Sequence, residues 1–202
     1  MKIIFTIGDS NGIGLECFFK ALNSFSENPK RKKTQMFIAG SKKTIYSYAK
    51  QLSNQLFNQN QINLILDGKV IINDTYCEII DCYDYSEVKF GEETKSSGRL
   101  AAASLKFAAK ETIAGNFDAI VTLPVAKNVL YSVRWMFPGQ TEFFAYMCGI
   151  EMPLMILFLN NIRVALATMH LPLKEVSQNI TQSNLIEIIE IFNKSLWLDF
   201  CI

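Results

Sequence analysis

Short runs of apolar, β-branched residues alternate with helical patterns along this chain. Residues 2–7 (KIIFTI) read as a strand, a glycine-rich turn follows, and from Leu15 the apolar residues take a helical spacing. Residues 35–40 (QMFIAG) repeat the order, with Ser41 as the predicted N-cap of the next helix. Because several of the strands are apolar throughout, the pattern indicates a largely parallel sheet that is covered on both faces.

The rest of the chain continues in the same style. From Asn63 to Asp84 the apolar clusters suggest short strands in an irregular or antiparallel insert, at NLILD (63–67), KVII (69–72) and CEIID (77–81). The elements expected after this insert are a long helix over 98–116, a buried strand over 117–125, a short helix from Ala126, a helix from Thr141, buried strands at 154–159 and 163–168, and a terminal helix over 183–198.

Composition excludes several classes of protein. Half of the 202 residues are hydrophobic and the net charge is only +1, which argues for a globular protein and against an obligate nucleic-acid binder. The five cysteines are odd in number and never form a CxxC pair, so we expect a reducing cytoplasm rather than a disulfide framework or a thiolate zinc site. No membrane span is expected, and the basic run at 29–33 (PKRKK) is interpreted as a solvated loop.

The turn GDSNGIG, residues 8–14, is the first candidate binding site. It places three glycines between a strand and a helix, where backbone can approach a ligand and helix amides can face an anion. It is neither GxGxxG nor the Walker pattern, and a tight turn needs glycine in any case. Gly8, Asp9 and Gly12 are therefore candidates for a place near a ligand, and Asp9 either caps the helix or lies at the ligand edge.

Four further polar residues stand beside predicted strand or helix ends. Lys127 follows a predicted strand, at the edge where open α/β sheets bind ligands, and is either an anion ligand or a surface lysine. Thr141 is a predicted N-cap, and its hydroxyl, with neighbouring Gln140, suits phosphate oxygens. His170 is the only histidine, so a metal bound there needs carboxylates or another chain to complete its ligands.

Five stretches in order resemble one family, 4-hydroxythreonine-4-phosphate dehydrogenase (the PdxA family). They are TIGDSNGIGLE (6–16), SSGRLAAASLKFA (96–108), DAIVTLPVAKNVL (118–130), FPGQTEFF (137–144) and RVALATMHLPLKEVSQNIT (163–181). The resemblance implies a three-layer α/β/α fold of the isocitrate/isopropylmalate dehydrogenase type and a cytoplasmic homodimer. It also implies NAD as cofactor and a divalent metal (Zn, Mg or Co) held by three histidines.

The implied reaction is the NAD-dependent oxidation and decarboxylation of 4-phosphohydroxy-L-threonine to 3-amino-2-oxopropyl phosphate, in pyridoxine 5'-phosphate biosynthesis. By the same resemblance His170 matches the first metal histidine, and Thr141 matches a substrate-contacting threonine. Gln140 stands where the family usually has histidine. Lys127 and the glycine turn match positions near the active cleft, and no residue is assigned a catalytic role.

The resemblance also predicts that the chain is incomplete. Family members continue for roughly another third or more of their length, so we expect the N-terminal part of such a dehydrogenase, truncated. Residues 1 to about 130 would form a first α/β region, and 131–202 the start of a second. This predicts exposed apolar surface that lowers solubility or pairs with another chain. Two alternatives remain: an inactive or split remnant that binds a phosphorylated metabolite or partner chain, and a paralogue, marked by Gln140, acting on a four-carbon phosphorylated sugar acid.

Overall fold

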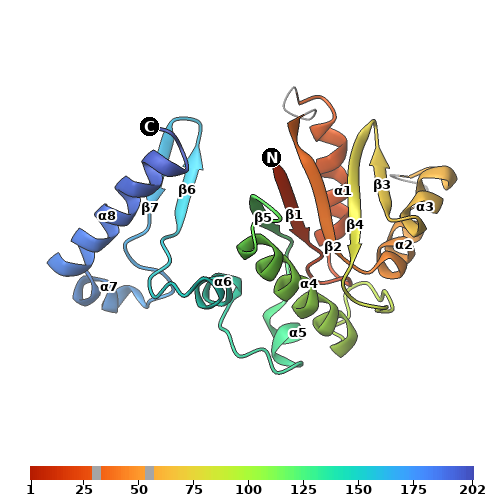
Figure 1. Ribbon diagram of the computed structural model, residues 1–202. Coiled ribbons are helices and arrows are strands. Elements are labelled where there is room, and N and C mark those ends of the chain that lie inside the picture. Colours follow the sequence, from red (N-terminus) through yellow and green to blue (C-terminus); the bar gives the residue numbers. More distant parts are fainter. Residues whose placement is uncertain (29–32, 53–56) are drawn as a thin grey trace. The chain divides into compact units, whose positions relative to one another are not determined.

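The computed structural model describes residues 1–28, 33–52 and 57–202 (Figure 1). Its contacts divide the chain into two compact units, Met1–Cys148 (unit 1) and Gly149–Ile202 (unit 2). The expectation of a family boundary near residue 130 stays a prediction. Residues 29–32 of the basic run lie outside the described residues, and only Lys33 of that run is described.

Unit 1 contains a five-stranded sheet with the order β3-β4-β2-β1-β5. The strands β4, β2, β1 and β5 are parallel, and β3 pairs antiparallel with β4 at one edge. This confirms the predicted parallel sheet and the predicted antiparallel pairing near residue 70. The strand bounds are β1 (Lys2–Thr6), β2 (Gln35–Gly40), β3 (Lys69–Ile72), β4 (Thr75–Asp81) and β5 (Ala119–Thr122).

Helices cover the two faces of this sheet, which gives the three layers that the sequence predicts. On one face, α1 (Gly14–Phe25), α2 (Lys42–Gln51) and α3 (Gln59–Leu66) bury side chains such as Phe19, Tyr48 and Ile65 against the strands. On the other face, α4 (Lys95–Ile113) lies over β1, β2 and β5. The apolar residues of β1, β2 and β4 alternate between these two layers, so both faces contribute to the core.

Two expectations about strands within unit 1 are wrong. The segment NLILD, predicted as a strand, belongs to α3, because Asn58 and Gln61 form a capping box and Ile62 and Ile65 bury one face of a helix. The strand predicted as buried over 117–125 is the shorter β5, and Val121 in it is 40% exposed. Among the described strands β5 lies at the edge of the sheet, so it has a paired neighbour on one side only.

Two short helices follow β5. They are α5 (Lys127–Tyr131) and α6 (Gln140–Cys148), both expected from the sequence. Leu130 from α5, Phe143 from α6 and Trp135 between them join residues of α4 in a second apolar cluster. The centroids of the Trp135 and Phe143 rings are 4.7 Å apart. This cluster holds the segment after β5 against α4.

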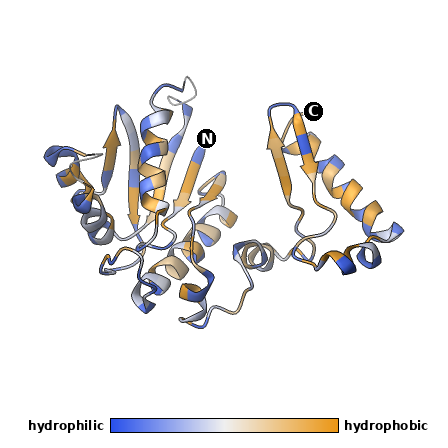
Figure 2. Ribbon diagram, turned by 180° about the vertical axis from the view of Figure 1, so that it is seen from behind, coloured by the Kyte–Doolittle hydropathy of each residue, from blue (hydrophilic) through white to orange (hydrophobic). Residues whose placement is uncertain are grey.

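Unit 2 is a two-stranded antiparallel sheet with two helices. Its elements are β6 (Ile156–Leu159), β7 (Ile162–Ala165), α7 (Leu173–Asn179) and α8 (Gln182–Leu198). The expectation of buried strands is wrong here, since Phe158 is 67% exposed and Leu159 70% exposed. Figure 2 shows apolar residues along most of β6, β7 and α8. A strand that is apolar throughout is normally buried on both faces of its sheet. The helices of unit 2 leave much of the apolar surface of β6 and β7 exposed.

No helix among the described residues is both long and apolar enough to span a membrane.

Gly98 provides a test of the packing between α4 and α5. A Cβ at this position would lie 2.4 Å from the carbonyl oxygen of Val129, which is backbone and cannot rotate away. In an isolated helix Gly→Ala is stabilising. We expect the opposite here: Gly98→Ala lowers the free energy of unfolding by roughly 2 kcal/mol, measured by urea denaturation.

Gly12→Ala is the matched control. Its added Cβ would meet nothing closer than the Asp9 carbonyl oxygen at 3.5 Å. We expect a change of less than about 1 kcal/mol. A stabilised Gly98→Ala protein would show that α4 and α5 are not packed as described.

Candidate functional site

The turn after β1 is pressed against the segment that follows β5. The Asp9 amide donates to the carbonyl oxygen of Pro124 at 2.9 Å. Gly8 has φ +66°, and a Cβ there would lie 2.4 Å from that same oxygen. The structure thus brings the glycine turn and the segment before Lys127 together at the carboxyl edge of the sheet. The close contact with Pro124 therefore explains the glycine at position 8 without any ligand.

Asp9 closes the turn and does not cap the helix. Its Oδ1 accepts from the Asn11 amide at 3.0 Å, and its carbonyl oxygen accepts from the Gly12 amide at 3.0 Å. The N-cap of α1 is Ile13, which makes no side-chain cap. Of the two roles left open by the sequence, the cap is excluded. The Asp9 side chain is almost buried, so its carboxylate serves first to shape the turn.

Asn11 is a structural residue of the site that sequence reasoning missed. It is buried, and its Nδ2 donates to the Glu92 carbonyl oxygen at 2.9 Å and to Thr94 Oγ1 at 3.1 Å. Its Oδ1 accepts from the Lys89 amide at 2.9 Å. Asn11 therefore fixes the loop before α4 against the glycine turn. An asparagine in a polar turn gives no sequence signal of partners about eighty residues away.

Two hydroxyl groups complete the surroundings of the turn. Tyr48 donates to the Gly12 carbonyl oxygen at 2.7 Å, and burial raises the pKa of Tyr48 to about 12. This phenol therefore remains a neutral donor at physiological pH. Ser10 is fully buried, and its Oγ has no hydrogen-bond partner among the described residues. A buried hydroxyl of this kind is where an ordered water or a ligand atom is expected to bind.

The predicted anion-binding residues lie on the two short helices of unit 1. Lys127 begins α5, its side chain is exposed, and no carboxylate of the described residues forms an ion pair with it. Gln140 begins α6, and Thr141 is already the second residue of this helix, so the expectation of a Thr141 cap is wrong. Gln140 Oε1 is buried and has no partner among the described residues. Both helices are held by the same apolar cluster.

His170 lies in unit 2, in the loop between β7 and α7. Its side chain is exposed and its φ is +55°, a left-handed conformation that few residues other than glycine adopt. No group of three or more His, Cys, Asp or Glu side chains arranged to hold a metal occurs in the described part of the chain. A structural zinc site takes about four ligands. His170 and its described neighbours therefore do not form a metal site by themselves.

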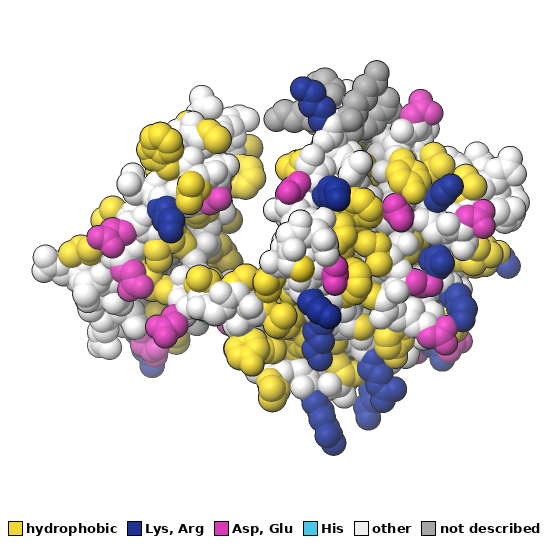
Figure 3. Space-filling view, viewed as in Figure 1, with side chains coloured by type: hydrophobic (Ala, Val, Ile, Leu, Met, Phe, Trp, Pro, Cys, Tyr) yellow, Lys and Arg dark blue, Asp and Glu magenta, His cyan; other side chains and the backbone are white. Residues whose placement is uncertain are grey.

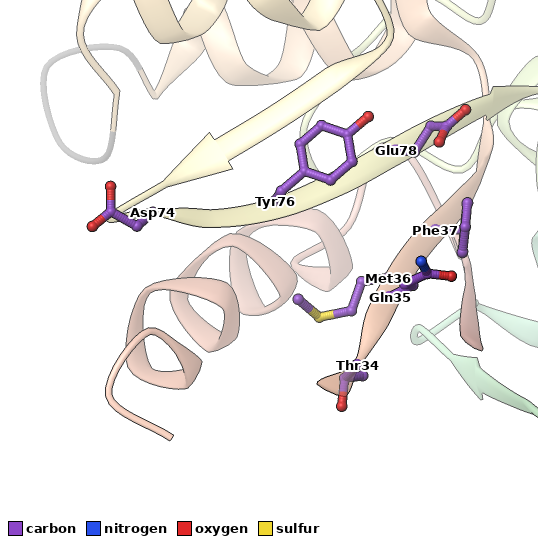
Figure 4. Close-up of a pocket in the computed structure, with 7 residues that line it drawn as sticks. All are labelled: Thr34, Gln35, Met36, Phe37, Asp74, Tyr76 and Glu78. Carbon is purple, nitrogen blue, oxygen red and sulfur yellow. The ribbon is translucent and has the colours of Figure 1, made fainter. Parts of the chain in front are cut away.

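A separate hollow of about 320 Å³ lies on the α4 side of the sheet, over β2 and β4. Figure 4 shows Tyr76 and Glu78 along β4 beside Gln35 and Phe37 of β2. It is present because α4 covers β1, β2 and β5 and leaves this part of β4 exposed. It lies toward the amino ends of these strands, away from the carboxyl edge, and contains none of the predicted site residues.

Comparison with known proteins assigns the chain a family. The sequence pattern of the family described as "Pyridoxal phosphate biosynthetic protein PdxA" matches residues 32–202. A 4-hydroxythreonine-4-phosphate dehydrogenase of Sulfurihydrogenibium sp. is 33% identical, over 96% of this chain and 57% of the relative. One from Bacteroides thetaiotaomicron is 32% identical, over 99% of this chain and 53% of the relative. The chain spans about half the length of the curated relatives it matches.

Solved structures agree with this assignment at the level of the fold. The crystal structure of a 4-hydroxythreonine-4-phosphate dehydrogenase from Burkholderia phymatum has a TM-score of 0.73 at 22% identity, over 96% of this chain and 58% of that one. The enzyme of the same name from Klebsiella pneumoniae also has a TM-score of 0.73, at 20% identity, over 96% and 59% of the two chains. These matches confirm the predicted three-layer α/β/α fold of the isocitrate dehydrogenase type.

The hydrogen bonds of Asn11 give a prediction for the loop before α4. Asn11→Ala removes three side-chain hydrogen bonds, and the Glu92 carbonyl oxygen and the Lys89 amide lose these part-buried partners. We expect the free energy of unfolding to fall by roughly 2 kcal/mol or more. Amide hydrogen exchange in residues 89–94 should accelerate by about tenfold.

Asn116→Ala is the control, because this exposed asparagine makes one side-chain bond, to Glu111. It should leave exchange in residues 89–94 unchanged. Equal exchange in the Asn11→Ala and wild-type proteins would contradict the role of Asn11.

Proposed function

This chain belongs to the PdxA family, and from that premise we propose that it serves the NAD-dependent oxidation and decarboxylation of 4-phosphohydroxy-L-threonine to 3-amino-2-oxopropyl phosphate. The observation that carries the proposal is the family match over residues 32–202. Two relatives named for this dehydrogenase activity are 33% and 32% identical to this chain over nearly its whole length. The product lies on the route to pyridoxine 5'-phosphate, and five free cysteines suit the cytoplasm.

The part we assign to this chain is recognition of the anionic substrate. Lys127 supplies a cation at the carboxyl edge of the sheet, and Gln140 and Thr141 begin α6, where free helix amides favour anions. The buried Oε1 of Gln140 has no partner within the described residues, so a substrate hydroxyl or ammonium group would satisfy it. The same amide rotated by half a turn would present its NH2 group to a phosphate oxygen.

The cofactors expected from the family are not matched by complete sites in the described residues. A Cβ at position 8 would collide with the Pro124 carbonyl oxygen, and the Asp9 carboxylate already accepts a hydrogen bond from the Asn11 amide. Both residues thus have roles within the turn, and neither is evidence for a dinucleotide site. His170 lacks neighbouring ligands in the described part of the chain. We therefore assign no chemical step to these residues. The remaining groups for hydride transfer and metal binding would come from outside the described residues.

A second candidate function, a split or inactive family member that binds a partner chain, is favoured by the apolar surface of unit 2. Phe158, Leu159 and Ile162 are each more than half exposed. Monomeric proteins rarely keep apolar patches of more than a few hundred Å² open. We propose that a second copy of the chain covers this surface, which agrees with the homodimer implied by the family.

A binding and turnover experiment tests the dehydrogenase proposal. Binding of 4-phosphohydroxy-L-threonine to the purified chain is measured by calorimetry, and NADH formation by absorbance with NAD and Zn²⁺, Mg²⁺ or Co²⁺ present. We expect Gln140→Ala to weaken substrate binding roughly tenfold, because it removes the amide from the first turn of α6. Gln178→Ala, an exposed glutamine of α7, should bind like wild type.

The two readouts separate the candidate functions. Turnover that is lost in His170→Ala supports a working dehydrogenase. Substrate binding without turnover supports the split family member, and tighter binding of a four-carbon phosphorylated sugar acid supports the paralogue. Substrate binding that is absent, or that Gln140→Ala leaves unchanged, contradicts the assignment of Gln140 and the role in recognition.

The proposed self-association gives a further prediction. Wild-type protein should sediment as a dimer or larger species, and Phe158→Glu should shift it toward monomer, because a buried unpaired carboxylate is costly at an apolar interface. Met136→Glu is the control, since Met136 is 87% exposed but lies in unit 1. A wild-type chain that stays monomeric at high concentration would show that no second copy covers this surface.

A further inference from the structure

Unit 1 contains a basic hollow that the proposed function does not use. It has a volume of about 340 Å³ and is lined by Lys95, Arg99, Ser132, Val133 and Arg134. Ligand pockets in proteins begin at roughly this size. We propose that it is a second anion site, which binds the phosphate group of a small phosphorylated molecule.

The fold brings the three cations together from two elements. Lys95 and Arg99 are four residues apart in α4 and therefore share one face of this helix. Gly98, between them, lets the backbone of α5 approach, as the 2.4 Å distance from a built Cβ to the Val129 carbonyl oxygen shows. The segment that leaves α5 then runs beside the exposed face of α4. Its residues Ser132 and Arg134 complete the hollow.

Arg134 occupies a backbone position that normally favours glycine. The Trp135 amide donates to the Leu130 carbonyl oxygen at 3.3 Å, and the Arg134 amide donates to that of Tyr131 at 3.1 Å. This is the Schellman pattern at the end of a helix, with Arg134 in the left-handed position at φ +62°. A residue with a Cβ is strained there. Arginine at this strained position has a guanidinium group that lines the hollow, whereas glycine would have no side chain there.

No carboxylate neutralises these cations. Within the described residues, none of the three forms an ion pair, whereas Lys20, Lys42, Lys43 and Lys89 each do. The acidic residue closest in sequence is Glu93, whose Oε1 accepts from Asn128 at 3.4 Å. Figure 3 shows basic side chains projecting at the end of unit 1 where α4 and α5 lie. A patch of positive charge remains for a ligand.

The lining indicates the chemical class of that ligand. Val133 is the one apolar residue among the five, so the hollow offers little to an apolar molecule. Two guanidinium groups, an ammonium group and a hydroxyl match the oxygens of a phosphate, which arginine binds in a bidentate manner. With a net charge of +1 the chain lacks the excess of basic residues typical of nucleic-acid binders, so a small molecule is favoured.

The hollow is distinct from the proposed substrate site. Lys127 begins α5, whereas Ser132 and Arg134 follow its end. Gln140 and Thr141 belong to α6 and do not line the hollow. The proposal therefore does not depend on dehydrogenase activity.

The test is a titration of the full chain with inorganic phosphate and with pyrophosphate at low ionic strength, followed by thermal shift and by calorimetry. We expect saturable binding that Arg99→Gln weakens roughly tenfold. Lys110→Gln removes one charge from the last turn of the same helix, about 16 Å from Arg99 along its axis. This control should bind like wild type.

Arg134→Gly separates binding from folding. Because glycine relieves the left-handed strain, the melting temperature without phosphate should rise by roughly 2 °C. Phosphate affinity should nevertheless fall, by about tenfold. A variant that is more stable but binds less well cannot be explained by misfolding.

Three results would overturn the proposal: phosphate binding that is not saturable, equal affinity of wild-type and Arg99→Gln proteins, or binding of a short oligonucleotide in the absence of phosphate binding. Loss of affinity in Lys110→Gln equal to that in Arg99→Gln would also contradict it, because the effect would then be one of overall charge.

Discussion

The contact between the Asp9 amide and the Pro124 carbonyl oxygen holds the functional edge of unit 1 together. It joins the end of β1 to the end of β5, and it exists only because Gly8 has no Cβ to meet that oxygen. Asn11 then binds the loop before α4 to the same turn. The glycine turn, and through Asn11 the loop before α4, are therefore linked to the end of β5.

A second close approach, between Gly98 of α4 and the Val129 carbonyl oxygen of α5, is likewise possible only because the glycine has no Cβ. Lys127 begins α5, and Arg134, which follows its end, lines the basic hollow. Gly8 and Gly98 thus serve packing between segments of the chain. A glycine-rich turn in a sequence is therefore weak evidence for a nucleotide, because the atom it makes room for can belong to the chain itself.

The two units differ in how much apolar surface they cover. In unit 1 helices lie on both faces of the sheet, and residues such as Ile4 and Ile38 are fully buried. In unit 2 the strands carry equally apolar side chains, but Ile188 alone among the described residues of that unit reaches the burial typical of a core. The chain spans about half the length of its relatives. Both facts agree with unit 2 having a neighbour in its working state.

Local signals in the sequence determined the strand–turn–helix order, the Ser41 cap and the long helix α4, because these depend on spacing and capping within a few residues. They failed at α3, where a capping box outweighed an apolar run, and at β6 and β7, where exposure depends on what covers the strands. Motif order identified the family. Only the tertiary structure decided the partners of Asn11, the lack of a metal-holding group around His170 in the described part of the chain, and the meeting of Arg134 with Arg99. Those contacts join residues far apart in the chain, and no pattern of neighbouring residues encodes them.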